Sequence, residues 1–131
     1  FPGIGSERKK ICGMKYYKTM KYKKGDIVII GFPFTDLSSV KKRPALIVSN
    51  NIVNATGDFL MVQITTKGRK DELTLPVKKT DFEDEKSLPL DSYLRLHKIF
   101  LLNESLVLYK AASVKKVFLS KAINNIVQLF K

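Results

Sequence analysis

Apolar residues in this chain come in short runs separated by polar segments, a pattern typical of a β-rich protein. Residues 26–32 form a nearly continuous apolar run, rich in Ile and Val and flanked by Gly25 and Pro33, which predicts a buried strand. Two further strands are predicted at 45–50 and 59–65. The segments between these strands are polar and hold the turn-forming residues expected of loops.

The second half of the chain predicts three more strands and a helix. These strands are expected at 73–77, 92–102 and 106–109. Exposed loops are expected at 33–42, 67–72 and 79–86. Partial alternation places Arg95 and His97 on one face of their strand and Lys98 on the other. Because apolar residues recur at helical spacing from about residue 114, the pattern predicts a mainly β fold, a small barrel or rolled sheet, with a C-terminal helix.

Length and cysteine content narrow the class of protein. The 131 residues suffice for one domain with a hydrophobic core and are too few for two ordinary domains. Cys12 is the only cysteine, which excludes an intrachain disulfide and makes a reducing cytoplasm the default location. Apolar runs stay below the roughly 18 residues of a membrane span, and residues 1–13 lack the apolar core of a secretory signal. We therefore expect a cytoplasmic protein without a membrane partner.

The formal net charge of +12 is unevenly distributed. Residues 1–24 hold eight Lys or Arg and one Glu, a net +7, whereas residues 25–131 carry only +5. We expect residues 1–20 to be a basic N-terminal extension, disordered or not native to the protein, and residues 21–131 to form the domain. Because the domain is only mildly basic, its charge gives weak support for a polyanionic partner.

Three motifs suggest a family. In order along the chain they read KGDIVIIGFPFTDL from Lys24, KRPALIVS from Lys42 and QITT from Gln63. In this order and spacing they resemble the MazF/PemK family of toxin endoribonucleases from type II toxin–antitoxin systems, over roughly residues 21–130. The resemblance implies an SH3-like barrel of the CcdB and MazF type that forms a homodimer. It also implies sequence-specific cleavage of single-stranded mRNA without a metal or other cofactor, growth inhibition, and neutralisation by a cognate antitoxin.

Cleavage of RNA without a metal needs a base for the 2′-hydroxyl, donors that stabilise the pentacoordinate phosphate, and an acid for the leaving oxygen. Arg43, expected at the mouth of a strand beside the rigid Pro44, suits the phosphate because its planar fork offers paired donors. A solvated surface charge is the alternative. Thr65 ends a predicted strand, where a hydroxyl can donate to phosphate, although β-propensity and turn capping explain most such threonines. The resemblance makes Arg43 the essential arginine and Thr65 a catalytic or substrate-contacting residue.

Arg95 and His97 are the other catalytic candidates. His97 is the only histidine of the chain, and histidine is the natural acid or base near neutral pH. A lone histidine on a strand is nevertheless more often a packed or surface side chain. Several members of the family carry an acidic residue near this position, paired with the preceding arginine, so the general base stays open. Arg95 either takes part in the chemistry or binds phosphate.

Four further residues are candidates for RNA contact. Phe34 could stack on an unpaired base or anchor its own loop. Lys42, Thr66 and Lys67 neighbour the catalytic candidates and could contact the RNA backbone. The sequence has no cluster of metal ligands and no Gly-rich phosphate loop.

The sequence leaves two rival functions open. Toxins of the CcdB type have similar barrels, bind DNA gyrase and catalyse nothing. An inactive RNA-binding or scaffold module is the second rival, which the absence of an acidic residue near His97 keeps open. The segments around Arg43 and Thr65 favour the ribonuclease.

Overall fold

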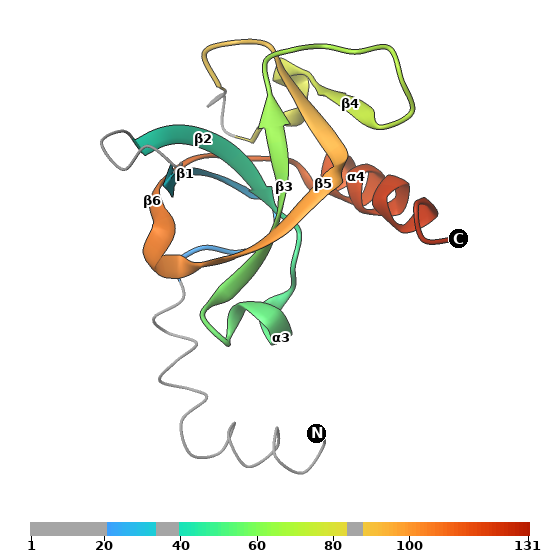
Figure 1. Cartoon of the computed structure of the whole chain (residues 1–131). Helices are drawn as coiled ribbons and strands as arrows, with labels where there is room; N and C mark the ends of the chain where they lie inside the picture. Colours follow the sequence, from blue (N-terminus) through green and yellow to red (C-terminus); the bar gives the residue numbers. More distant parts are fainter. Residues whose placement is uncertain (1–20, 34–39, 84–87) are drawn as a thin grey trace.

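The computed structural model describes residues 21–33, 40–83 and 88–131, which form one antiparallel sheet and a C-terminal helix (Figure 1). The strands are β1 (Asp26–Pro33), β2 (Val40–Ile47), β3 (Asp58–Thr65), β4 (Thr74–Val77), β5 (Ser92–Asn103) and β6 (Val107–Ser113). The helices are α3 (Asn51–Asn54), the 3-10 turns η2 (Lys79–Asp81) and η3 (Glu104–Leu106), and α4 (Lys116–Gln128). Among the described residues, no helix combines the length and the apolar character needed to cross a membrane.

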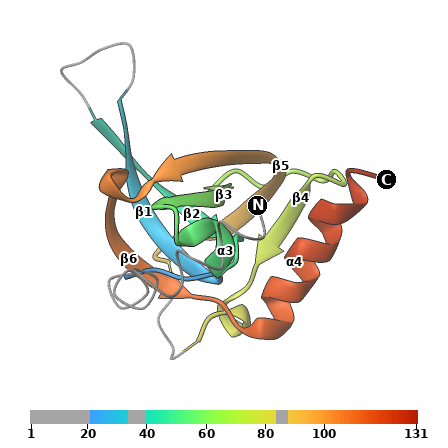
Figure 2. The same cartoon turned by 90° about the horizontal axis from the view of Figure 1, so that it is seen from below.

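The sheet has the order β4-β5-β3-β2-β1-β6 and curls strongly, as Figure 1 and Figure 2 show. Its edge strands, β4 and β6, are not paired with each other, so the sheet is not closed. The two edges are joined where the chain beyond each strand meets the other: Glu83 N donates to Ser113 O, and Lys115 N donates to Asp81 O, both at 2.8 Å. The predicted mainly β fold with a C-terminal helix is confirmed, in the form of a curled, open sheet.

Apolar clusters cover both faces of the sheet. One cluster lies between the sheet and α4, whose buried side chains are Phe118, Leu119, Ala122 and Ile126. The other lies on the opposite face and contains Val28, Ile30, Ala45, Ile47, Phe59, Met61 and Leu102. The apolar run of β1 is nearly continuous because its residues contribute alternately to the two clusters, Ile27 to the first and Val28 to the second.

The second strand differs from its prediction. It begins at Val40, where a loop was expected, and ends at Ile47. Arg43 therefore lies inside a strand, opposite Ile30 of β1, and the expectation that it sits at a strand mouth is wrong. The cause is the long pairing of β1 with β2, which begins at Val40. The pairing of β2 with β3 begins only at Ala45, so the first residues of β2 are paired with β1 alone. Pro44 is tolerated because it lies outside that second ladder, where its missing N–H breaks no bond.

A short helix occupies part of the segment predicted as a loop between β2 and β3. The Asn50 side chain caps α3 by accepting hydrogen bonds from Ile52 N at 3.0 Å and Val53 N at 3.4 Å. Gly57 then turns the chain into β3 with a φ of 93°, a conformation that favours glycine. The strand predicted at 106–109 is also longer than expected, because β6 continues to Ser113 beside β1.

One buried carboxylate ties the first strand to the edge strand. Asp26 is 1% exposed and accepts hydrogen bonds from Lys23 N at 3.0 Å and from Ser113 Oγ at 2.9 Å. The ammonium of Lys110 lies 3.6 Å from the same carboxylate. Since Ser113 and Lys110 both belong to β6, Asp26 fastens the edge of the sheet to its centre.

We predict that Asp26→Ala lowers the free energy of unfolding by roughly 3 kcal/mol, because the variant leaves two part-buried donors without their charged acceptor. Urea denaturation followed by circular dichroism measures the change. Asp58→Ala is the matched control: Asp58 also opens a strand, but its carboxylate accepts only an exposed hydrogen bond from Asn103, so less than about 1 kcal/mol should be lost. Equal losses in the two variants would contradict this role of Asp26.

Candidate active site

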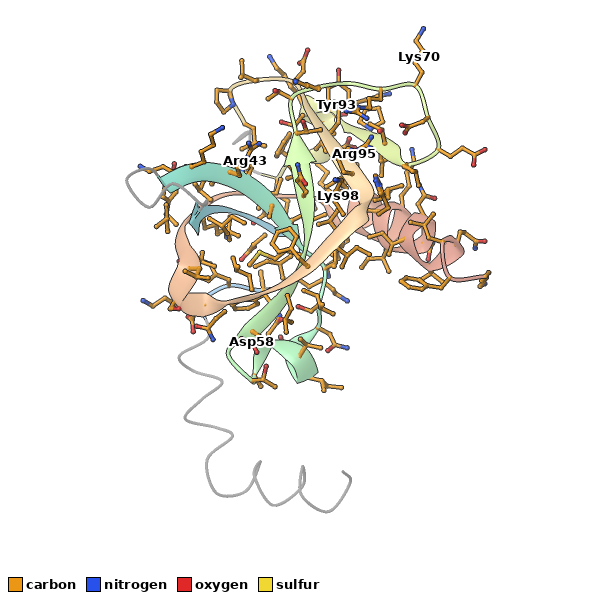
Figure 3. All side chains as sticks on the ribbon, in the orientation of Figure 1. Arg43, Asp58, Lys70, Tyr93, Arg95 and Lys98 are labelled. Carbon is orange, nitrogen blue, oxygen red and sulfur yellow. The ribbon has the colours of Figure 1, made fainter. Side chains whose placement is uncertain are left out.

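A basic pocket of about 280 Å³ lies where β3 and β5 meet the loop that follows β3. Its lining consists of Gln63, Thr65, Lys67, Arg69, Arg95, His97 and Lys98. Four of these side chains are Lys or Arg and none is acidic, so the pocket suits an anion. Figure 3 shows two of the basic residues, Arg95 and Lys98, on β5.

Arg95 is the deeply buried member of this lining, at 8% exposure. Its Nη1 donates to Asp71 Oδ2 at 3.5 Å and to the Thr74 hydroxyl. Thr74 faces Arg95 directly in the β4–β5 ladder, and Asp71 belongs to the loop between β3 and β4. The edge strand and its loop together hold one end of the guanidinium.

The other edge of the Arg95 guanidinium is open. Every buried side-chain nitrogen and oxygen of the described residues has a hydrogen-bond partner, whereas Nε and Nη2 of Arg95 bond to none of these residues. Because Arg95 lines the pocket, these two nitrogens are the donors that it can offer to a ligand there. The Nε–Nη2 edge matches two oxygens of a phosphate in a bidentate contact.

Asp71 is ionised at neutral pH. The hydrogen bond from the Thr74 hydroxyl, with further bonds from Leu73 N and Arg95, lowers the pKa of the Asp71 carboxyl below its ordinary value, against an opposing rise from desolvation. Because its pKa in the folded protein lies below that in the unfolded chain, the interaction with Arg95 is fully present near neutrality. The interaction is lost only when the pH falls through this lowered pKa.

Thr65 and His97, two catalytic candidates, both line the pocket. The Thr65 hydroxyl accepts a hydrogen bond from Lys67 N at 3.2 Å, which is turn capping, and its own proton stays free to be donated to a ligand. His97 is exposed on β5. Lys67 also lines the pocket, whereas Thr66 is exposed and is not part of the lining.

Arg43 and Lys42 lie on β2 and are not part of this lining (Figure 3). The strand register nevertheless relates Arg43 to the pocket. Ala45 is paired with Gln63 in an antiparallel ladder. Arg43 lies two residues before Ala45, and Thr65 lies two residues after Gln63. Side-chain alternation therefore places Arg43 and Thr65 on the same face of the sheet. The β2–β3 ladder has ended at this level, so Arg43 lies on a part of β2 that is not paired with β3. Phe34 lies outside the described residues.

Three lining residues were not foreseen from the sequence. Gln63 could have been found by counting two residues back from Thr65 along the strand. Lys98 was expected on the opposite face from His97, and this expectation is wrong. The β3–β5 register shifts between Val62 and Ile64, so alternation along β5 is interrupted and Lys98 lines the same pocket. Arg69 is one of several charges in a loop, and no sequence signal distinguishes it.

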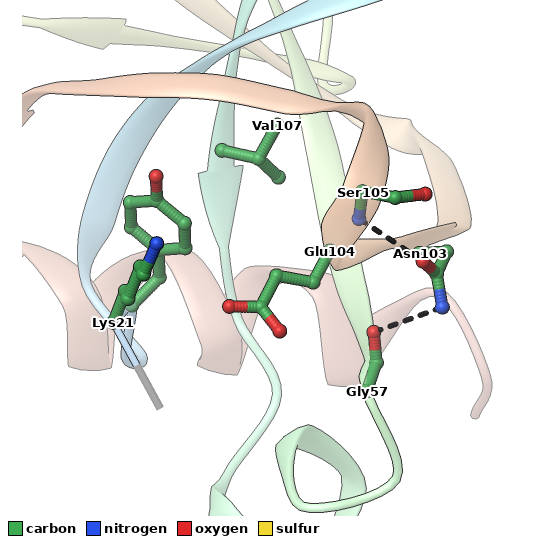
Figure 4. A pocket seen from close by; sticks show the side chains of 7 residues that line it. Lys21, Gly57, Asn103, Glu104, Ser105 and Val107 are labelled. Atoms are coloured by element: carbon green, nitrogen blue, oxygen red, sulfur yellow. Dashed lines mark hydrogen bonds between the residues drawn. The ribbon is translucent and has the colours of Figure 1, made fainter. Parts of the chain in front are cut away.

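A second pocket, of about 540 Å³, lies at the opposite end of β3 (Figure 4). Its lining includes Lys21, Tyr22, Gly57, Asn103 and Glu104, and it holds none of the predicted site residues. One cation and one carboxylate make it less suited to a phosphate than the smaller basic pocket. In the described part of the chain, no group of three or more His, Cys, Asp or Glu residues could hold a metal ion.

Comparison with protein families identifies the family of the chain. Residues 23–130 match the family described as PemK-like, MazF-like toxin of type II toxin–antitoxin system. The chain belongs to this family. Comparison with curated protein sequences found no significant relative of this MazF-like chain.

Solved structures with the same fold include MazF proteins. An endoribonuclease in complex with its cognate antitoxin, from a mycobacterial species, has a TM-score of 0.66 at 21% identity over 82% of this chain and 92% of that one. MazE–MazF from Deinococcus radiodurans gives a TM-score of 0.68 at 15% identity, over 83% and 95%. MazF alone from the same organism gives 0.65 at 17% identity, over 83% and 96%. These similarities establish the MazF-like fold.

We predict that Lys98→Gln weakens binding of a single-stranded RNA that carries 2′-O-methyl groups and cannot be cut by 2′-oxygen attack. If Lys98 neutralises one phosphate, the slope of log affinity against log salt concentration should fall by about 0.7. Fluorescence anisotropy at several salt concentrations measures both effects. Lys116→Gln, at the start of α4 and away from the pocket lining, should leave the slope unchanged, and equal effects of the two variants would refute a local role for the pocket.

Proposed function

We propose that this protein is a toxin endoribonuclease that cleaves single-stranded RNA at specific sequences, without a metal, and thereby inhibits growth. One observation carries the proposal: in a member of the MazF-like family, a basic pocket holds Thr65, Arg95 and His97 together. Structures of the same fold described as endoribonucleases support it.

The reaction that fits these side chains is attack by a 2′-hydroxyl on the adjacent phosphate. The 2′-oxygen loses its proton and bonds to phosphorus, the bond from phosphorus to the 5′-oxygen breaks, and that oxygen takes up a proton. The products are a 2′,3′-cyclic phosphate and a 5′-hydroxyl. The open Nε–Nη2 edge of Arg95 and the hydroxyl of Thr65 are suited to stabilise the charge that develops on the phosphate oxygens.

His97 is the proposed proton-transfer group. No acidic residue lines the pocket in the described part of the chain, and histidine is the side chain that ordinarily changes charge between pH 5 and 8. Since His97 is exposed to solvent, water can carry the second proton. Lys67, with Arg69 and Lys98, would hold the phosphates on either side of the cleaved bond, and Arg43 would approach from β2.

The family also supports proposals about partners. We assign residues 21–131 to the toxin domain and residues 1–20 to an N-terminal extension, in line with the match over 23–130.

A homodimer would cover the exposed apolar side chains of Leu106, Leu108 and Tyr109, at and beside the edge strand β6. A cognate antitoxin would bind with an acidic segment that competes with RNA for the basic pocket, and related structures contain MazE or a cognate antitoxin.

Purified protein should cut a long single-stranded RNA at a limited set of sites in excess chelator, leaving 5′-hydroxyl ends. Mapping of the new 5′ ends by sequencing measures this. Arg95→Ala should lower the rate about 100- to 1000-fold, as expected for the loss of an aligned donor to a developing charge. Activity only with added divalent metal would refute the metal-free reaction, and inhibition of gyrase without RNA cleavage would favour the CcdB-type alternative.

A second test concerns the proton transfer. His97→Gln should lower kcat about 100- to 10,000-fold, while binding of the 2′-O-methyl RNA persists. Because His97 is exposed, the melting temperature should change little. A rate within a few-fold of the parent would show that His97 is only a side chain of the strand, and that the proton goes directly to water.

A further inference from the structure

Two residues outside the pocket lining form hydrogen bonds with the buried Arg95. Asp71 and Thr74 do not line the pocket, yet both accept hydrogen bonds from the same nitrogen, Nη1 of Arg95. Thr74 also contributes to lowering the pKa of the Asp71 carboxyl. The main-chain N–H of Leu73 donates to the second carboxylate oxygen, Oδ1, at 3.0 Å. Asp71 and Thr74 therefore hold the same nitrogen of Arg95, and the main chain in turn holds Asp71.

The charges around Arg95 show why this network matters. A buried guanidinium is costly unless an anion compensates it. The pocket lining holds no carboxylate, and its other Lys and Arg residues, Lys67, Arg69 and Lys98, repel Arg95. Asp71, 3.5 Å away, forms an ion pair with Arg95. Without its negative charge, the arginine would be drawn toward solvent and away from its buried position.

We propose that Asp71 and Thr74 are positioning residues, which hold one end of the Arg95 guanidinium so that its Nε–Nη2 edge faces the phosphate to be cleaved. This inference rests on the proposed function and adds two residues that do not line the pocket. Their contribution is orientation: a displacement of about 1 Å in a group that contacts the reacting atoms can cost about 100-fold in rate.

The loop that carries Asp71 is itself held against β5. A Cβ atom added to Gly68 would lie 2.8 Å from Cζ of Tyr93, so the main chain at Gly68 lies directly on the Tyr93 ring. Tyr93 is paired with Thr65 across the β3–β5 ladder. The Tyr93 ring thus supports the loop at Gly68, three residues before Asp71. Tyr93 also lies beside Thr65, a proposed catalytic residue at the end of β3.

The test compares Asp71→Asn and Thr74→Val with Glu72→Gln, which removes the neighbouring exposed carboxylate. Asp71→Asn and Thr74→Val should each lower kcat for cleavage of single-stranded RNA about 10- to 100-fold. The KM should change less than about threefold, because Lys67, Arg69 and Lys98 still bind the RNA backbone. Glu72→Gln should behave as the parent, and Asp71→Glu should recover part of the rate.

A double-mutant cycle separates positioning from a role in folding. If Asp71 acts through Arg95, Asp71→Asn should add no further loss in the Arg95→Ala background. Multiplicative losses, or losses that follow the melting temperature, would overturn the inference. Equal losses from Asp71→Asn and Glu72→Gln would do the same.

An NMR measurement that does not depend on RNA cleavage tests the positioning of Arg95 separately from the proposed ribonuclease function. In 15N-labelled full-length protein, the Nε–H signal of Arg95, assigned by its disappearance in Arg95→Lys, should shift or broaden in Asp71→Asn and stay in place in Glu72→Gln. A parent protein that cuts no RNA but shows this response would refute the proposed function and leave the fixed arginine supported. A signal that is insensitive to Asp71→Asn would refute the positioning role whether or not RNA is cut.

Discussion

The pairing of β3 with β5 is the interaction on which the rest of the molecule depends. It lies near the centre of the sheet, and its irregular register between Val62 and Ile64 breaks the simple alternation of β5. Leu94 and Leu96 still reach the cluster beneath α4, while Arg95, His97 and Lys98 all line the pocket on the other face. A regular ladder would have sent Lys98 back toward the core. The irregularity therefore concentrates charge in one place without weakening the apolar packing.

Most strands could be predicted from the sequence because their signals are local. The apolar run at 26–32 and the alternation at 92–102 depend only on which face each residue buries, and both correspond to observed strands. The start of β2 could not be predicted in this way. Val40 to Lys42 look like a loop by composition, and they become a strand because β1 supplies hydrogen-bond partners for them.

The candidate site was predictable where it lies on strands and less so elsewhere. Thr65, Arg95 and His97 were found from strand ends, alternation and the resemblance to MazF/PemK toxins. The roles of Asp71 and Thr74 depend on contacts between residues more than 20 positions apart, which no local pattern encodes. Where the resemblance leads one to expect an acidic residue near His97, the carboxylate beside Arg95 comes instead from the loop after β3.

The pocket combines positions of two kinds. Gln63, Thr65 and Arg95 belong to strands whose alternate residues form the core, so a change there disturbs neighbours on the opposite face. Lys67 and Arg69 belong to an exposed loop that contributes little to the core. Substitutions at these two exposed positions should therefore change folding little. The charge of the pocket at Lys67 and Arg69 can therefore change without a change of fold.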